Sequence, residues 1–188
     1  MNYIPYETGQ VRNIFPFIHR GIQQFILGGP ADGDEAQLLC KEFPWIKATG
    51  FEPNLQWYEY QRSADFPGEL RTEALLDVVG ESYFTEGSNL RSSRVADEGA
   101  QAIKTVTLDS LFAPAPVGSI ALWIDIEHSE MKALRGADTL LNDGSIDVLM
   151  VEAMYEEEVI AIRAHMDLKG YKEVLFYNSH DYIFQKQR

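Results

Sequence analysis

The chain alternates between short apolar runs and segments of helical periodicity, and this order predicts its fold. Apolar runs typical of buried parallel strands occur at residues 24–29, 46–53, 120–127 and 146–154. Segments whose apolar positions recur at i, i+3, i+4 and i+7, as on one face of a helix, occur at residues 32–43, 54–63, 129–141 and 156–170. This alternation predicts an α/β protein with helices on both faces of a mostly parallel sheet, a doubly wound, Rossmann-like arrangement.

The remaining segments complete this picture. A third strand is predicted at 69–76, and 104–112 alternates in polarity before the break APAPVG. Residues 80–101 are polar and glycine-containing, so we expect a long loop with a strand or two of its own, serving a site. The last segment, 171–188, predicts an antiparallel hairpin. We expect one domain over 1–188, with an unassigned N-terminal segment (1–23) and a core (24–188).

The composition and net charge of the chain limit the classes of partner that it can bind. The chain has 188 residues, of which 16 are basic and 29 acidic, a formal net charge of -13. That field repels nucleic acid and anionic membranes, so neither is expected as a partner. The sequence has no apolar run long enough to span a bilayer, no signal-peptide pattern and a single cysteine. We therefore expect a cytoplasmic protein; the oligomeric state is left open.

Carboxylates follow three of the predicted strands. Glu52 ends the second strand, Asp125 and Glu127 end the strand at 120–127, and Glu152 lies near the end of the next one. In doubly wound sheets the ligand binds beyond the carboxyl ends of the strands. Acids gathered there would repel one another unless a cation or hydroxyl groups lay between them. The pattern predicts a polar or positively charged ligand.

A glycine-containing stretch, GGPADGD (28–34), separates the first strand from its helix. Glycines allow the backbone to approach a ligand closely, and a helix N-terminus favours electron-rich groups. The stretch differs from the dinucleotide G-x-G-x-x-G pattern and lacks the lysine of a P-loop. Binding of nucleotide phosphates is therefore not supported.

Several segments, in order, resemble one family. They are GFEPN, ALLDVVGESYF, TVTLDSL and, above all, WIDIEHSEMKALRGADTLL followed by IDVLMVEA. This series resembles the FkbM-type methyltransferases, which transfer a methyl group from S-adenosylmethionine to a hydroxyl oxygen of sugars or polyketides. The resemblance covers roughly residues 24–185. Its most specific part is D-x-E-x-x-E-x-x-x-L-x-G-A, from Asp125 to Ala137.

The resemblance implies S-adenosylmethionine as the cofactor and a small hydroxylated molecule as the acceptor. It implies that Glu52 holds the ribose hydroxyls, for which a carboxylate is well suited. It places these residues at the cofactor: Gly29, Asp32 and Gly33 in the glycine loop, Glu52 and Pro53, Leu75 and Asp77 near the adenine, and Asp125 at the methyl or amino group.

The candidate catalytic residues are Asp125, Glu127 and His128. Asp125 or His128 would take the proton of the acceptor hydroxyl, and Glu127 would brace the turn or face the acceptor. Two positions depart from the family pattern. Leu27 replaces an acid two residues before the first loop glycine, a charge that Asp32 or Asp34 could supply. His128 replaces the glycine that usually follows D-x-E.

Two other functions fit parts of the sequence. A metal-dependent glycosyltransferase would hold a cation with Asp125-x-Glu127, and a methyltransferase-like binding module would have lost its cofactor through the Leu27 change. His19, His165 and His180 lack metal-ligand spacing. No metal site is therefore predicted for the methyltransferase.

Overall fold

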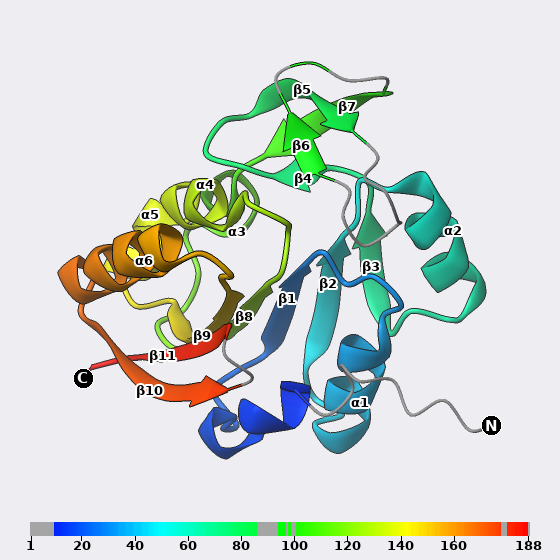
Figure 1. Ribbon diagram of the computed structural model, residues 1–188. Helices are drawn as coiled ribbons and strands as arrows, with labels where there is room; N and C mark the ends of the chain where they lie inside the picture. Colours follow the sequence, from blue (N-terminus) through cyan, green and yellow to red (C-terminus); the bar gives the residue numbers. More distant parts are fainter. Residues whose placement is uncertain (1–9, 86–93, 97, 99–100, 178–179, 188) are drawn as a thin grey trace.

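The computed structural model describes residues 10–85, 94–96, 98, 101–177 and 180–187. Its main sheet contains β1 (Gln24–Gly28), β2 (Lys47–Phe51), β3 (Gly68–Arg71), β8 (Ile120–Ile124), β9 (Ile146–Glu152), β10 (Tyr171–Tyr177) and β11 (Asp181–Lys186). The strand order is β10-β11-β9-β8-β1-β2-β3 (Figure 1). Strand β11 runs antiparallel to both of its neighbours, β10 and β9, and the other neighbouring pairs of this sheet are parallel. The predicted α/β sheet with a C-terminal antiparallel hairpin is confirmed; part of its expected turn lies outside the described residues.

Helical segments cover both faces of this sheet (Figure 1). One face carries η1 (Gln10–Asn13), η2 (Phe15–Phe17) and α1 (Asp34–Glu42). The other carries α3 (Leu108–Phe112), α4 (Glu130–Arg135), α5 (Asp138–Asn142) and α6 (Glu156–Leu168). Within the described part of the chain, no helix combines the length and apolar character needed to cross a bilayer.

The period of two along β1 divides the core. Phe25 and Leu27 pack with Val11 and Leu39 on the face of η1 and α1. Ile26 points the other way and belongs to the cluster formed with α4, α5 and α6. The apolar run of β1 is continuous because both faces of this strand are buried. The N-terminal segment, unassigned from the sequence, thus contributes to the core through η1.

A second, smaller sheet lies beyond the carboxyl ends of β1 to β3 (Figure 1). It contains, in the order β4-β7-β5-β6, the strands β4 (Ala74–Leu75), β7 (Gln101–Val106), β5 (Gly80–Thr85) and β6 (Arg94–Ala96). The expected strands within 80–101 are confirmed. The prediction of one strand at 69–76 is wrong, because β3 joins the main sheet and β4 the small one. Arg71 sits at this bend, its guanidinium 2.9 Å from Glu69 and 2.7 Å from Glu73.

The single helix predicted at 129–141 is also wrong, since α4 ends before Gly136 and α5 begins after it. A Cβ on Gly136 would lie 2.1 Å from the carbonyl oxygen of Leu76, so glycine permits close contact with the chain after β4. Asp109 of α3 accepts hydrogen bonds from the backbone N–H groups of Thr139 (2.8 Å) and Leu140 (3.1 Å). A side chain from another helix therefore caps the start of α5.

The helix predicted at 54–63 is present as α2 (Leu55–Ser63), but the apolar side chains on its predicted face are not buried. Leu55 is 50% exposed, whereas Gln61 is buried. The Gln61 side-chain amide donates a hydrogen bond to the carbonyl oxygen of Ala31 in the glycine loop. Because α2 lies beside the edge strand β3, a polar contact rather than an apolar stripe joins it to the rest of the molecule.

Candidate active site

A cavity of about 210 Å³ opens at the carboxyl ends of the parallel strands. Its wall comes from four loops and from the small sheet. The lining residues are Gly29 and Ala31 after β1, Phe51 to Asn54 after β2, Trp57 of α2, Asp125 to Glu127 and Ser129 after β8, Glu152 and Met154 at β9, and Ala74, Leu75, Phe84 and Val95 of the small sheet. We call this cavity the cleft. It lies where doubly wound sheets bind ligands, beside the β1/β8 reversal of strand order.

The structure brings together most of the site residues predicted from the sequence. Those on the wall of the cleft are Gly29, Glu52, Pro53, Leu75, Asp125 and Glu127. The other four are absent from that wall: Asp32, Gly33, Asp77 and His128. The cofactor and catalytic roles of all ten residues remain predictions.

Sequence reasoning missed several wall residues. Asn54 is the N-cap of α2, and its side-chain oxygen accepts hydrogen bonds from the N–H groups of Gln56 and Trp57. This capping pattern was a usable signal. Phe84 had no such signal, because β5 reaches the cleft only through the pairing of the small sheet.

Glu52 is the most deeply buried acid of the predicted cofactor set, with 5% of its surface exposed. Its Oε1 accepts a hydrogen bond of 2.9 Å from the N–H of Asn54. Burial raises the pKa of Glu52 from 4.5 to about 7, although backbone hydrogen bonds oppose that rise. Beside it, the side-chain amide nitrogen of Asn54 is buried and has no hydrogen-bond partner among the described residues. The cleft therefore offers a ligand one acceptor and one donor at neighbouring positions.

Gly29 joins the loop after β1 to the loop after β8. Its φ is +72°, and a Cβ would lie only 1.9 Å from the carbonyl oxygen of Asp125. Its N–H donates to the carbonyl oxygen of Phe51 at 3.0 Å, and the N–H of Asp125 donates to that of Gly28 at 3.1 Å. These two hydrogen bonds hold the loops after β1, β2 and β8 in one arrangement at the cleft.

Leu27 of β1 and Asp32 of the following loop both lie away from the cleft wall. Leu27 is fully buried in the core against α1. An acid at this position would be desolvated unless partnered. Asp32 is half-buried, and burial raises its pKa while the N–H of Asp34, 3.4 Å from its Oδ1, lowers it. The suggestion that Asp32 replaces the missing charge stays a prediction.

Carboxylates crowd the β8 and β9 side of the cleft. Asp125 and Glu152 hydrogen-bond each other through their side chains. Burial raises the pKa of Asp125 well above its ordinary value, and the charges of Glu152, Glu127 and Glu130 raise it further. Burial likewise raises the pKa of Glu127, and the charge of Glu152 raises it further.

Glu130 stabilises the loop after β8 through a hydrogen bond to its backbone. It is buried, and its Oε1 accepts a hydrogen bond of 3.1 Å from the N–H of Ile126. Burial raises its pKa to about 8, and the neighbouring carboxyl of Glu158 adds to this rise. Ser129 occupies the N-cap position of α4 without making a side-chain cap hydrogen bond. Glu130 therefore positions the backbone that carries Asp125 and Glu127.

His128 is exposed and lies outside the cleft, in a small adjoining hollow that also includes Glu127, Glu152 and Met154. Its φ is +70°, and its ring lies 5.2 Å from that of Tyr155. The left-handed backbone explains why the family pattern has glycine here, since glycine adopts it without steric cost. The role of His128 as a base stays a prediction.

The left-handed backbone of His128 predicts different stabilities for two substitutions at this position. His128→Gly and His128→Ala both remove the ring contact with Tyr155, but only alanine keeps a Cβ in the left-handed region. We expect the glycine variant to be the more stable by about 1 kcal/mol in the free energy of unfolding, measured by urea denaturation. Equal stabilities would show that the loop relaxes out of this conformation.

The sheet order and the cleft define the class: a Rossmann-like α/β protein of the methyltransferase type. A precorrin-6y C5,15-methyltransferase from Geobacter metallireducens shares the fold at 13% identity and TM-score 0.58, over 100% of this chain and 92% of that one. A SAM-dependent O-methyltransferase from Thermotoga maritima does so at 10% identity and TM-score 0.52, over 98% and 66%. M. capricolum TrmK, solved with S-adenosylhomocysteine, aligns at 8% identity and TM-score 0.52, over 94% and 66%.

The sequence identifies the family within this class. The family model described as the methyltransferase FkbM domain matches residues 44–173. The chain belongs to this family, which confirms the resemblance drawn from its motifs. No curated protein sequence matches the chain significantly. The family is one of methyltransferases, so the glycosyltransferase alternative has no support from it.

Proposed function

We propose that the protein is an S-adenosylmethionine-dependent methyltransferase that methylates a hydroxyl oxygen of a small molecule, such as a sugar or a polyketide. Membership of the FkbM family supports methyl transfer and this cofactor. The observation that carries the proposal is the buried carboxyl of Glu52 in the cleft wall. Glu52 has no salt-bridge partner among the residues that the structure describes. Burial of such an acid is costly, and a ligand rich in hydroxyl groups offsets that cost.

The cleft fits the parts of S-adenosylmethionine. Glu52 accepts hydrogen bonds from the two ribose hydroxyls, and the unpartnered amide of Asn54 donates one to the same part of the molecule. Leu75 and Phe84 supply an apolar wall for the adenine. Gly29 has no side chain, so the methionine part passes close to the backbone there.

The reaction needs little beyond positioning and a proton acceptor. The acceptor oxygen attacks the methyl carbon, the carbon–sulfur bond breaks, and S-adenosylhomocysteine leaves with the bonding electrons. The hydroxyl proton passes to a carboxylate on the acceptor side, Asp125 or Glu127, or to His128. Carboxylates there also favour the cationic sulfonium of the cofactor over its neutral product.

Isothermal titration calorimetry with S-adenosylmethionine and S-adenosylhomocysteine, in buffer containing a chelator, tests the cofactor. We expect both to bind one per chain without added metal. Binding only of a sugar nucleotide, and only with a divalent cation, would support the glycosyltransferase. Binding of neither would indicate the non-catalytic module.

The acceptor is tested separately. Labelled methyl groups from the cofactor should appear in ether oxygens when the protein is incubated with pooled small hydroxylated metabolites. The charge of -13 favours small molecules over nucleic acid as acceptors. Label found in RNA or in amine nitrogens instead would contradict the proposed O-methylation.

A further inference from the structure

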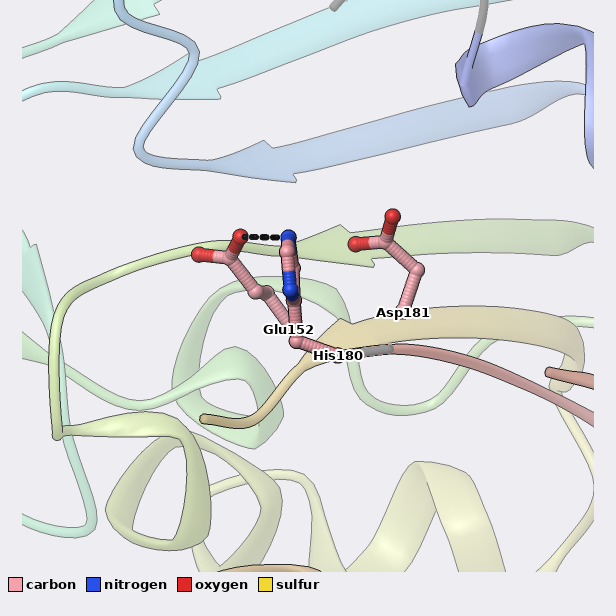
Figure 2. A group of neighbouring side chains, drawn as sticks. All are labelled: Glu152, His180 and Asp181. Atoms are coloured by element: carbon pink, nitrogen blue, oxygen red, sulfur yellow. Dashed lines mark ion pairs between the residues drawn. The ribbon is translucent and has the colours of Figure 1, made fainter. Parts of the chain in front are cut away.

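Glu152, His180 and Asp181 meet at the carboxyl end of β9, a group that the spacing of the histidines in the sequence does not reveal. One potential ligand atom from each residue lies within 4.8 Å of the other two. Figure 2 shows Glu152 and His180 side by side, with Asp181 next to them on the adjoining strand. The Nε2 of His180 is 3.3 Å from the Oε1 of Glu152.

The pairing of β9 with β11 creates this group. Asp181 is directly opposite Glu152 in the antiparallel register, so both side chains leave the sheet on one face. Two carboxylates opposite each other are destabilising unless a positive charge lies near them. The carbonyl oxygen of His180 accepts a hydrogen bond of 2.8 Å from the N–H of Ala153, which fixes the backbone that carries the imidazole.

We propose that Glu152, His180 and Asp181 form a binding site for a divalent transition-metal ion of the Mn²⁺ or Zn²⁺ type. An imidazole with two carboxylates suits these ions, whereas Mg²⁺ and Ca²⁺ prefer oxygen ligands alone. The three side chains converge without rearrangement of the strands. Three protein ligands leave at least one coordination position for water or a substrate oxygen.

The site adjoins the cleft through Glu152, which lines it and hydrogen-bonds Asp125. An ion bound here holds the acceptor hydroxyl beside the methyl group and favours its ionised form. The existence of the metal site is independent of the proposed methyl transfer, but this role for the ion rests on it. The ion would also offset the negative charge of Glu127 and Asp125 nearby.

Mn²⁺ titration of the full chain, free of cofactor, tests the site by calorimetry and by electron paramagnetic resonance. We expect one Mn²⁺ per chain, displaced by Zn²⁺. His180→Gln and Asp181→Asn should each weaken Mn²⁺ binding at least about tenfold. His19→Gln is the matched control: His19 also pairs with a β9 carboxylate, 3.2 Å from Asp147, but at the opposite end of the strand, and should bind as the wild type.

Absence of saturable binding of both ions would overturn the proposal, as would Mn²⁺ binding that is unchanged in both variants. Thermal melting verifies that the variants fold. If Asp181→Asn does not fold, the His180→Gln variant decides the outcome, because His180 is partly exposed. Calorimetry of S-adenosylmethionine in chelator separates the two proposals. If the wild type binds the cofactor but neither Mn²⁺ nor Zn²⁺, the metal site alone is refuted. If it binds Mn²⁺ but not the cofactor, the proposed function alone is refuted.

Discussion

Glu52→Gln is expected to weaken S-adenosylmethionine binding about 100-fold at pH 8 while making the free protein more stable. Hydrogen bonds from the ribose hydroxyls to a charged acceptor contribute about 2–3 kcal/mol, and each 1.4 kcal/mol is tenfold in affinity. Glutamine keeps the size of the side chain and an oxygen that accepts from the N–H of Asn54, so the fold is retained. Isothermal titration calorimetry measures the affinity.

The gain in stability follows from the pKa of Glu52, which burial raises from 4.5 to about 7. A carboxyl whose pKa is higher in the folded state makes the protein less stable as pH rises between those two values. Above pH 7 the full cost is present, on the order of 3 kcal/mol. Glutamine does not ionise, so the variant should exceed the wild type in free energy of unfolding at pH 8. The two should converge near pH 4.

Urea denaturation of both proteins at pH 4 and pH 8 isolates the contribution of Glu52, since the other titrating groups are common to the pair. Glu59→Gln, on the exposed face of α2 with 57% of its side chain accessible, is the matched control and should change neither affinity nor pH dependence. A pH-independent difference in stability would contradict the buried-carboxyl account. Unchanged cofactor affinity would contradict the ribose contact.

Gly29→Ala is expected to lower the free energy of unfolding by about 3 kcal/mol and to abolish measurable cofactor binding. The φ of +72° disfavours any residue with a Cβ, and that atom would meet the carbonyl oxygen of Asp125 at 1.9 Å. Relief requires the loops after β1 and β8 to separate, and both form the wall of the cleft. Urea denaturation and calorimetry measure the two effects.

Gly80→Ala provides the control for Gly29. Gly80 begins β5, and the nearest atom to an added Cβ, the Oγ1 of Thr105, is 4.0 Å away. Its substitution should change stability by less than about 0.5 kcal/mol and leave cofactor binding intact. Similar losses in the two variants would mean that the close approach at Gly29 is not what limits substitution there.

The pattern of apolar residues within a segment correctly predicted the elements whose buried positions repeat regularly along their length. The strands β1, β8 and β9 are covered on both faces, so their apolar runs are continuous and visible in the sequence. Helix α6 buries Val159, Ile162 and Met166 at helical spacing, as predicted. Such elements depend on the side chains of their own segment, and their periodicity is therefore sufficient evidence.

Local pattern failed where a distant partner sets the boundary. The segment 69–76 divides because its halves pair with different sheets, β3 with β2 and β4 with β7. The helix expected at 129–141 divides because Asp109 caps α5 from another helix. Neither partner is close in sequence, so no spacing within these segments reveals the break.

The sequence by itself determined the α/β class, the methyltransferase family and the gathering of acids at one edge, because parallel strands bring their carboxyl ends together. Tertiary structure decided the surroundings of each acid: Glu52 is buried beside Asn54, and burial raises the pKa of Asp125, which lies beside Glu152. It also placed His180 against Glu152 through the pairing of β9 and β11. Burial and contacts between distant residues set these properties, and neither is encoded in the spacing of a single segment.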